Sequence, residues 1–170
     1  MVRVIDACTV LINSQGGNDT NRAIAHVQRG SMYRRLGKYE LALADYSEAL
    51  RHDPNSAMAY TGRGNAYRGL KLFDLAISDH TEAIRLRPDV AAYYNNRGNV
   101  WRDIKDNERA IADYDLSIKV DPTYATAYYS RGNARLTSGD KDGAAADFEQ
   151  AAKLNPAFRP ATERVRQVEL

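Results

Sequence analysis

The sequence lacks the residues on which several classes of protein depend. Its single cysteine, Cys8, excludes an internal disulfide, cannot alone form a cysteine metal site and leaves the redox compartment undetermined. No run of about 18 apolar residues occurs, so no membrane span is expected. The 24 basic and 22 acidic residues nearly cancel, which does not favour nucleic acid as the partner.

Motifs for catalysis and cofactor binding are missing as well. The sequence contains no metal-binding motif of two histidines and a glutamate on one helix, no nucleophile elbow and no glycine-rich phosphate loop. Gly62-Arg63-Gly64 falls within a predicted helix and is not a phosphate-binding turn. We therefore predict no catalytic residue, no metal site and no cofactor, and we expect a protein that is not an enzyme.

What the sequence does contain is a repeat of 34 residues. Four of its five prolines follow this period: Pro54, Pro88, Pro122 and Pro156. The same spacing relates four further sets of residues: Gly30, Gly64, Gly98 and Gly132; Ala42, Ala76, Ala110 and Ala144; Arg29, Arg63, Arg97 and Arg131; Asp45, Asp79, Asp113 and Asp147. A fixed period in this range indicates a repeat architecture.

Each repeat is predicted to form two helices. In the second repeat, residues 57–70 place Tyr60, Gly64 and Tyr67 on one stripe at helical spacing, and residues 73–86 carry a second stripe. Gly37 and Gly139 suit a left-handed end of the first helix. Each closing proline is expected to end the second helix at the residue before it.

These positions resemble the tetratricopeptide repeat, whose pattern alternates aromatic and small residues and closes on proline. In the second repeat the matching residues are Tyr60, Gly64, Tyr67, Phe73, Ala76, Ala83 and Pro88. The resemblance covers residues 23–158 as four gapless units: 23–56, 57–90, 91–124 and 125–158. It implies an all-α fold, a right-handed superhelix (α-solenoid) of antiparallel helical hairpins in which neighbours bury one another's apolar faces. Departures include Arg135 and Lys141, which occupy two aromatic positions of the fourth unit.

The two ends are expected to differ from the repeats. Residues 1–22 are predicted to form a helix, the second half of an incomplete unit, and a loop; residues 159–170 are predicted to form a capping helix that begins at Pro160. A start in mid-repeat leads us to expect a fragment or a removed leader. Many bacterial proteins with similar repeats carry a leader, so the compartment stays open between cytoplasm and periplasm.

The recurring arginine and aspartate predict a repeated ion pair that fastens helices within or between units, as in Arg29 with Asp45. The alternative is that both residues are solvated. Among the three histidines, His26 and His80 occupy positions that are Tyr or Phe in other units, which predicts packing in the core. His52 is expected at a solvated helix end.

A polar stripe along the first helices is the predicted binding surface. In tetratricopeptide proteins the first helices line the concave groove, and here they carry two ladders three residues apart, which share a helix face. The ladders are Ser31, Asn65, Asn99 and Asn133, and Arg34, Arg68, Arg102 and Leu136, with Asn95, Asn96 and Tyr129 at the flank. Asparagine can pair with a peptide unit of any sequence, and arginine favours an acidic partner. We predict that an extended peptide or protein segment binds there; the alternative is an ordinary polar helix surface.

One known variant of this binding mode is not expected. Tetratricopeptide co-chaperones hold the C-terminal carboxylate of a heat-shock chaperone with lysine, arginine and asparagine. Asn65 and Asn96 match the two asparagines, but Thr61, Thr126 and Ser130 occupy the cationic positions. A carboxylate clamp is therefore not predicted.

Other functions stay open beside that of an adaptor. The incomplete first unit or the last hairpin is an alternative site of self-association, which would make the protein a homo-oligomer. A non-catalytic domain of a larger assembly is a further alternative, and nucleic-acid binding through the arginines is weaker because the acidic residues balance them.

Overall fold

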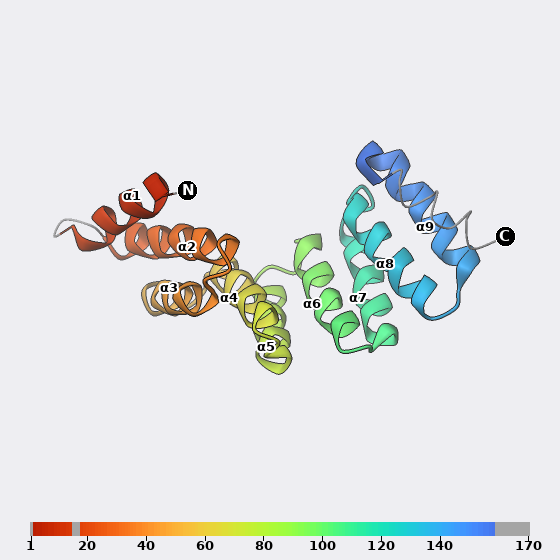
Figure 1. The fold of residues 1–170 in the computed structure, drawn as a ribbon, viewed down its shortest axis with the longest axis horizontal. Helices are drawn as coiled ribbons and strands as arrows, with labels where there is room; N and C mark the ends of the chain where they lie inside the picture. The colour runs from red at the N-terminus through yellow and green to blue at the C-terminus, as the bar shows by residue number, and fades with distance from the viewer. Residues whose placement is uncertain (1, 15–17, 159–170) are drawn as a thin grey trace. The chain divides into compact units, whose positions relative to one another are not determined.

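The computed structural model describes residues 2–14 and 18–158, and within these ranges it is entirely helical (Figure 1). Nine α-helices and one short 3-10 helix follow one another there, and these residues contain no strand. The helices are α1 (Val2–Asn13), α2 (Asp19–Arg35), α3 (Tyr39–His52), α4 (Ala57–Gly69), α5 (Phe73–Leu86), α6 (Ala91–Asp103), α7 (Asn107–Val120), α8 (Ala125–Thr137), α9 (Lys141–Leu154) and η1 (Pro156–Phe158). The all-α class expected from the repeat is confirmed.

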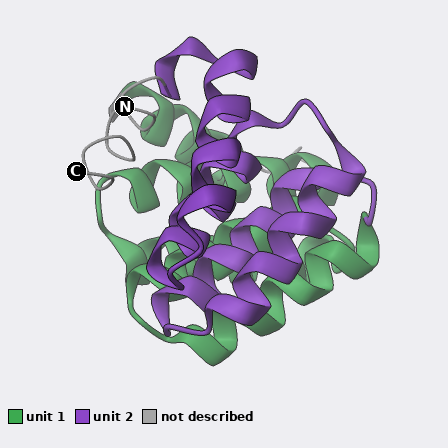
Figure 2. Cartoon of the chain, turned by 90° about the vertical axis from the view of Figure 1, so that its right-hand side faces the viewer, with its two compact units in different colours: residues 1–87 green, residues 88–170 purple. Residues whose placement is uncertain are grey.

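The chain divides into two compact units, residues 1–87 and residues 88–170 (Figure 2). In the first unit, α2 packs on α3 and α4 on α5, with α3 against α4 and α1 against α2. In the second unit, α6 packs on α7 and α8 on α9, with α7 against α8. Since each pair is joined by only a few residues, every repeat is an antiparallel helical hairpin. The first helices also meet within a unit, α2 with α4 and α6 with α8.

The turn inside each hairpin has one residue in the left-handed conformation, which is glycine in two hairpins and lysine in the other two. Gly37 (φ 71°) and Gly139 (φ 88°) adopt the left-handed conformation, as predicted, and Lys71 (φ 60°) and Lys105 (φ 70°) adopt it at the same repeat position. In the first hairpin, Lys38 N–H donates to Tyr33 C=O at 2.9 Å and Gly37 N–H to Arg34 C=O at 3.0 Å. This pair of bonds is a Schellman motif, which closes the end of the first helix.

Small residues lie where the two helices of a hairpin cross. Ala42, Ala76, Ala110 and Ala144 are fully buried. A Cβ placed on Gly98 would come within 2.7 Å of Tyr114 Cε1 and 3.2 Å of the Ala110 carbonyl oxygen, both on α7. The position therefore admits no side chain unless the Tyr114 ring and the backbone of α7 move.

The ends of the described chain cover the outermost hairpins. Helix α1 packs on α2 and buries Cys8, whose thiol lies 3.8 Å from Gln28 Oε1. Burial raises the pKa of the Cys8 thiol. At the other end, Phe158 of η1 stacks on Tyr129 with ring centroids 4.8 Å apart. The predicted capping helix at 159–170 lies outside the described residues. Among those that are described, no helix is long and apolar enough to cross a bilayer.

Candidate peptide-binding surface

The repeated arginine and aspartate form four internal ion pairs. Each guanidinium on a first helix makes two hydrogen bonds of 2.6–2.9 Å to the carboxylate on the second helix of the same hairpin: Arg29 with Asp45, Arg63 with Asp79, Arg97 with Asp113, and Arg131 with Asp147. The predicted pairing is confirmed, and each pair lies within a single hairpin. All four aspartates are buried. Hydrogen bonding to Asp79 raises the pKa of Arg63, as Asp113 raises that of Arg97, so both stay charged.

Two of these arginines reach a neighbouring helix too. Arg29 Nη1 donates to Thr9 Oγ1 of α1 at 2.9 Å, and Arg131 Nη1 donates to Asp115 of α7 at 2.5 Å. The ladder therefore ties α1 to the first hairpin and joins the two hairpins of the second unit. These arginines are therefore engaged within the fold.

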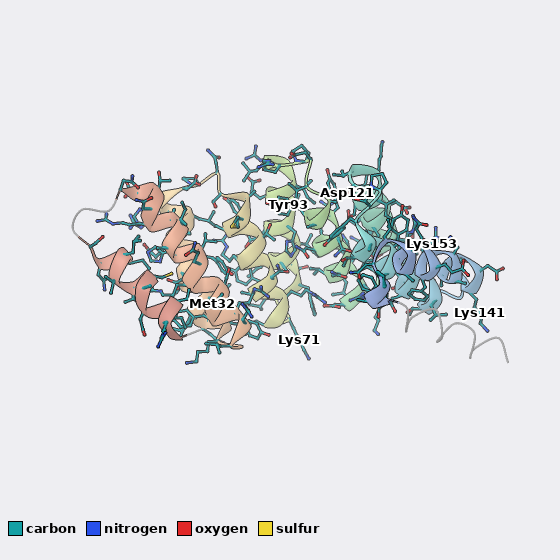
Figure 3. All side chains as sticks on the ribbon, turned by 90° about the horizontal axis from the view of Figure 1, so that it is seen from above. Met32, Lys71, Tyr93, Asp121, Lys141 and Lys153 are labelled. Carbon is teal, nitrogen blue, oxygen red and sulfur yellow. The ribbon has the colours of Figure 1, made fainter. Side chains whose placement is uncertain are left out.

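The predicted polar stripe lies on the first helices of both units (Figure 3, where Met32 marks α2 and Tyr93 marks α6). The residues of the stripe are half-buried: Ser31 and Arg34 on α2, Asn65 and Arg68 on α4, Asn99 and Arg102 on α6, and Asn133 and Leu136 on α8. Since α2 contacts α4 and α6 contacts α8, each unit presents two neighbouring rungs of the stripe.

Buried aromatic residues orient parts of this stripe. Tyr114 O–H donates to Asn99 Oδ1 at 2.9 Å, and Ser31 Oγ lies 3.0 Å from Tyr46 Oη in the equivalent pair of the first hairpin. The fourth hairpin has Phe148 at that position, and Asn133 Nδ2 donates to the backbone oxygen of Tyr129 instead, at 2.8 Å. The amide of Asn99 is thus held through its oxygen, whereas the amide of Asn133 is held through its nitrogen.

The three flanking residues are not equivalent. Asn96 is half-buried, but Asn95 is only 2% exposed, so its expected place on an open flank is wrong. Asn95 lies three residues before Gly98 and therefore on the packed face of α6. Its Oδ1 has no hydrogen-bond partner among the described residues. Tyr129 packs against Phe148 as well as Phe158, so its ring is part of the core of the last hairpin.

No cation occupies the positions that a carboxylate clamp requires. Thr61 Oγ1 donates to the Ala57 carbonyl oxygen of its own helix at 2.9 Å. Ser130 is buried and Thr126 is half-buried. A peptide carboxylate placed beside Asn65 or Asn96 would meet no lysine or arginine from these three positions.

Sequence reasoning missed one cluster of polar side chains. His26 of α2 and both Glu48 and His52 of α3 place donor atoms within 4.8 Å of one another. His52 is not solvated as expected: its side chain is 9% exposed, and its ring stacks on His26 at a centroid distance of 6.0 Å. The signal was that two histidines replace residues of the repeat in the same hairpin.

Comparison with family models gives the same repeat. A model described as "TPR repeat" matches residues 30–70 and 98–139, and two described as "Tetratricopeptide repeat" match residues 57–90 and 125–158. Together they span more than two thirds of the chain. A search of curated protein sequences found no match.

Several solved structures have the same fold, and three of them are described below. MamA is 25% identical over 90% of this chain and 87% of its own, with a TM-score of 0.74. The first TPR of Spaghetti (RPAP3), solved with the HSP90 peptide SRMEEVD bound, is 26% identical over 69% of this chain and 93% of its own, with a TM-score of 0.64. PilF of Pseudomonas aeruginosa is 22% identical over 86% of this chain and 68% of its own, with a TM-score of 0.79.

Proposed function

Because the chain belongs to the tetratricopeptide repeat family, we propose that it is a non-catalytic adaptor that binds an extended segment of a partner protein along the first helices of its hairpins. The observation that carries this proposal is that the polar residues of those helices form two separate sets. The arginines of the ion pairs hold the fold, while the residues of the polar stripe lie on another face.

The spacing of the stripe suits an extended chain. Packed helices lie about 8–10 Å apart, and an extended peptide advances about 3.3–3.6 Å per residue. Neighbouring rungs, such as Asn65 on α4 and the Ser31 rung on α2, would therefore meet roughly every third residue of the peptide. An asparagine amide can hydrogen-bond to a peptide group whatever its side chain, so this contact sets position rather than sequence.

The charges of the stripe favour an acidic segment. Arg34, Arg68 and Arg102 follow the amide ladder at the next turn of their helices, and guanidinium groups pair with carboxylates through two hydrogen bonds. The RPAP3 domain that shares this fold was solved with an acidic peptide, SRMEEVD. Since Thr61, Thr126 and Ser130 replace the cations of a carboxylate clamp, we propose that side-chain carboxylates of the partner, and not its C-terminus, are recognised.

The test begins with a segment mapped from a partner captured by the native protein, measured by calorimetry. Arg102→Ala should weaken binding by about tenfold or more, since a hydrogen bond to a charged group contributes roughly 1.5–3 kcal/mol. Lys119→Ala removes the same charge from an exposed position on α7 and is the matched control. Amidation of the peptide's C-terminus should leave affinity unchanged. Equal affinities of the Arg102→Ala and Lys119→Ala proteins would contradict the assignment of the stripe.

Self-association is the second candidate, and one observation favours it. Val4, Val10 and Leu11 are exposed on α1, with Val10 at 72%. A second copy that covers this face would bury apolar surface worth about 25 cal/mol per Å². Light scattering over a range of concentrations distinguishes the two functions: Val10→Asp should abolish any dimer but leave peptide affinity intact.

A further inference from the structure

The first hairpin contains a group of side chains that the other hairpins lack. His26 projects from α2, and Glu48 and His52 are four residues apart on α3, so all three meet at one end of the hairpin. The imidazoles are largely buried, with side-chain exposures of 8% for His26 and 9% for His52. Glu48 is 48% exposed, which leaves one side of the group open to solvent.

Both imidazoles are held by carboxylates through the same nitrogen. His26 Nδ1 lies 2.9 Å from Asp45 Oδ1, and His52 Nδ1 lies 3.0 Å from Asp19 Oδ1. An ionised carboxylate only accepts hydrogen bonds, so Nδ1 carries the proton, and in the neutral imidazole Nε2 has the lone pair that can bind a metal. A carboxylate behind each imidazole is the arrangement that orients histidines for metal binding. Asp45 is itself fixed by two hydrogen bonds from Arg29.

A cation already bridges the remaining ligand atoms. Arg51 Nη2 lies 3.2 Å from His52 Nε2, and Arg51 Nε donates to Glu48 Oε2 at 2.9 Å. These contacts show that His52 Nε2 and the Glu48 carboxylate face the same positively charged guanidinium group. The Arg51 side chain is 65% exposed and can turn away from these two groups into solvent.

The other three hairpins show which residues the same helix packing accepts at the positions of His26 and His52. At the position of His26 the other hairpins have Tyr60, Tyr94 and Tyr128, and at the position of His52 they have Leu86, Val120 and Leu154. The same hairpin geometry is therefore built without histidine three times. Packing alone does not account for two histidines beside a glutamate in one hairpin.

We propose that His26, Glu48 and His52 bind a late first-row divalent metal ion, with Zn²⁺ as its representative, through Nε2 of both imidazoles and one carboxylate oxygen. Imidazole ligands select such ions over Mg²⁺ and Ca²⁺. Zinc takes ligands at about 2.0–2.2 Å and accepts three protein groups with water in a fourth position. The ion would displace Arg51 and link the end of α3 to α2, and this role is independent of peptide binding.

Calorimetry with ZnCl₂ and the untagged protein tests the proposal, with MgCl₂ as the comparison ion. Saturable binding of one Zn²⁺, a raised melting temperature and no effect of Mg²⁺ are expected. His26→Tyr and His52→Leu install the residues that the other repeats carry at these positions, so both variants should fold, which circular dichroism checks. Each should weaken Zn²⁺ binding at least tenfold.

Two further kinds of variant separate this cluster from other zinc ligands. His80→Tyr also replaces a histidine by the residue of another repeat, and Cys8→Ser removes the thiol; neither should alter Zn²⁺ affinity. Asp19→Asn keeps the ligands but weakens the carboxylate behind His52, and it should reduce affinity about tenfold. Absence of saturable Zn²⁺ binding, wild-type affinity in the double variant His26→Tyr/His52→Leu, or an equal loss in His80→Tyr would each overturn the proposal.

Discussion

In the hairpin α6–α7 the buried carboxylate of Asp113 is held by Arg97. In the hairpin α8–α9 the equivalent carboxylate, that of Asp147, is shared by Arg131 and Arg135. Arg135 stands where the preceding hairpin has Trp101, and its Nη1 donates to Asp147 Oδ2 at 3.0 Å. Two hairpins of one unit thus place the same ion pair in different networks. Arg135, which departs from the repeat, thus provides a second hydrogen-bond donor to the repeated aspartate of this hairpin, Asp147.

The largest expected effect on stability comes from replacing the paired arginine of either hairpin, Arg97 in α6–α7 or Arg131 in α8–α9. Arg97→Ala leaves the Asp113 carboxylate buried without its bidentate partner and should cost roughly 3–5 kcal/mol of unfolding free energy. Arg131→Ala should cost less, by about 1 kcal/mol or more, because Arg135 still donates to Asp147. Urea denaturation followed by circular dichroism measures both. Because Arg131 also donates to Asp115, the two variants are compared in proteins that both carry Asp115→Asn. Equal losses in that background would mean that Arg135 does not support Asp147.

The glycines at the crossings should respond alike in the two hairpins. A Cβ on Gly98 would lie 2.7 Å from Tyr114 Cε1, and one on Gly132 would lie 2.8 Å from Phe148 Cε1. Leucine at either position overpacks the crossing and should cost about 1–3 kcal/mol or more. A melting temperature that stays unchanged in Gly98→Leu would refute the packing described for α6 on α7.

The two hairpins have different residues at the left-handed position of the turn, Lys105 and Gly139. Substitutions at these two positions should change the unfolding free energy in opposite directions. Lys105 pays the steric cost of a left-handed residue that Gly139 avoids, so Lys105→Gly should stabilise the protein by about 1 kcal/mol and Gly139→Ala should destabilise it by a similar amount. Both positions are exposed, which limits other effects. The urea midpoint is the measurement, and a shift of the same sign in both variants would contradict the turn assignment.

The smallest expected effect concerns the residue behind the polar stripe. Tyr114→Phe makes the third hairpin like the fourth, which already has Phe148, and removes the hydrogen bond to Asn99 Oδ1. The loss should be about 0.5–1.5 kcal/mol of stability. Peptide affinity should also fall slightly, because the Asn99 amide is then free to rotate. The double variant Tyr114→Phe/Asn99→Ala should lose no more affinity than Asn99→Ala alone.

The binding surface was only partly predictable. The ladders of Asn99 and Arg102 could be placed on one face from their spacing, because residues three apart share a face of any helix. The burial of Asn95 could not, since the face on which it lies becomes interior only when α6 packs on its neighbours. Spacing likewise gave no sign that a tyrosine on another helix would hold the Asn99 amide.

The amino-acid sequence by itself determined the architecture of this protein. Its period defined the hairpins and the paired arginines and aspartates, because each depends on residues within one repeat and recurs in every copy. The glycines of the first and fourth copies, Gly37 and Gly139, likewise marked their turns. Such local rules need no knowledge of distant contacts.

Only the tertiary structure decided how individual side chains are used. It placed Lys71 and Lys105 in left-handed turns, gave Asp147 a second arginine, and brought His26 to Glu48 and His52. The physical reason is that hydrogen-bond direction, burial and ligand distance depend on the packing of one helix against another. A repeat pattern specifies that packing on average, but not for the residues that depart from the pattern.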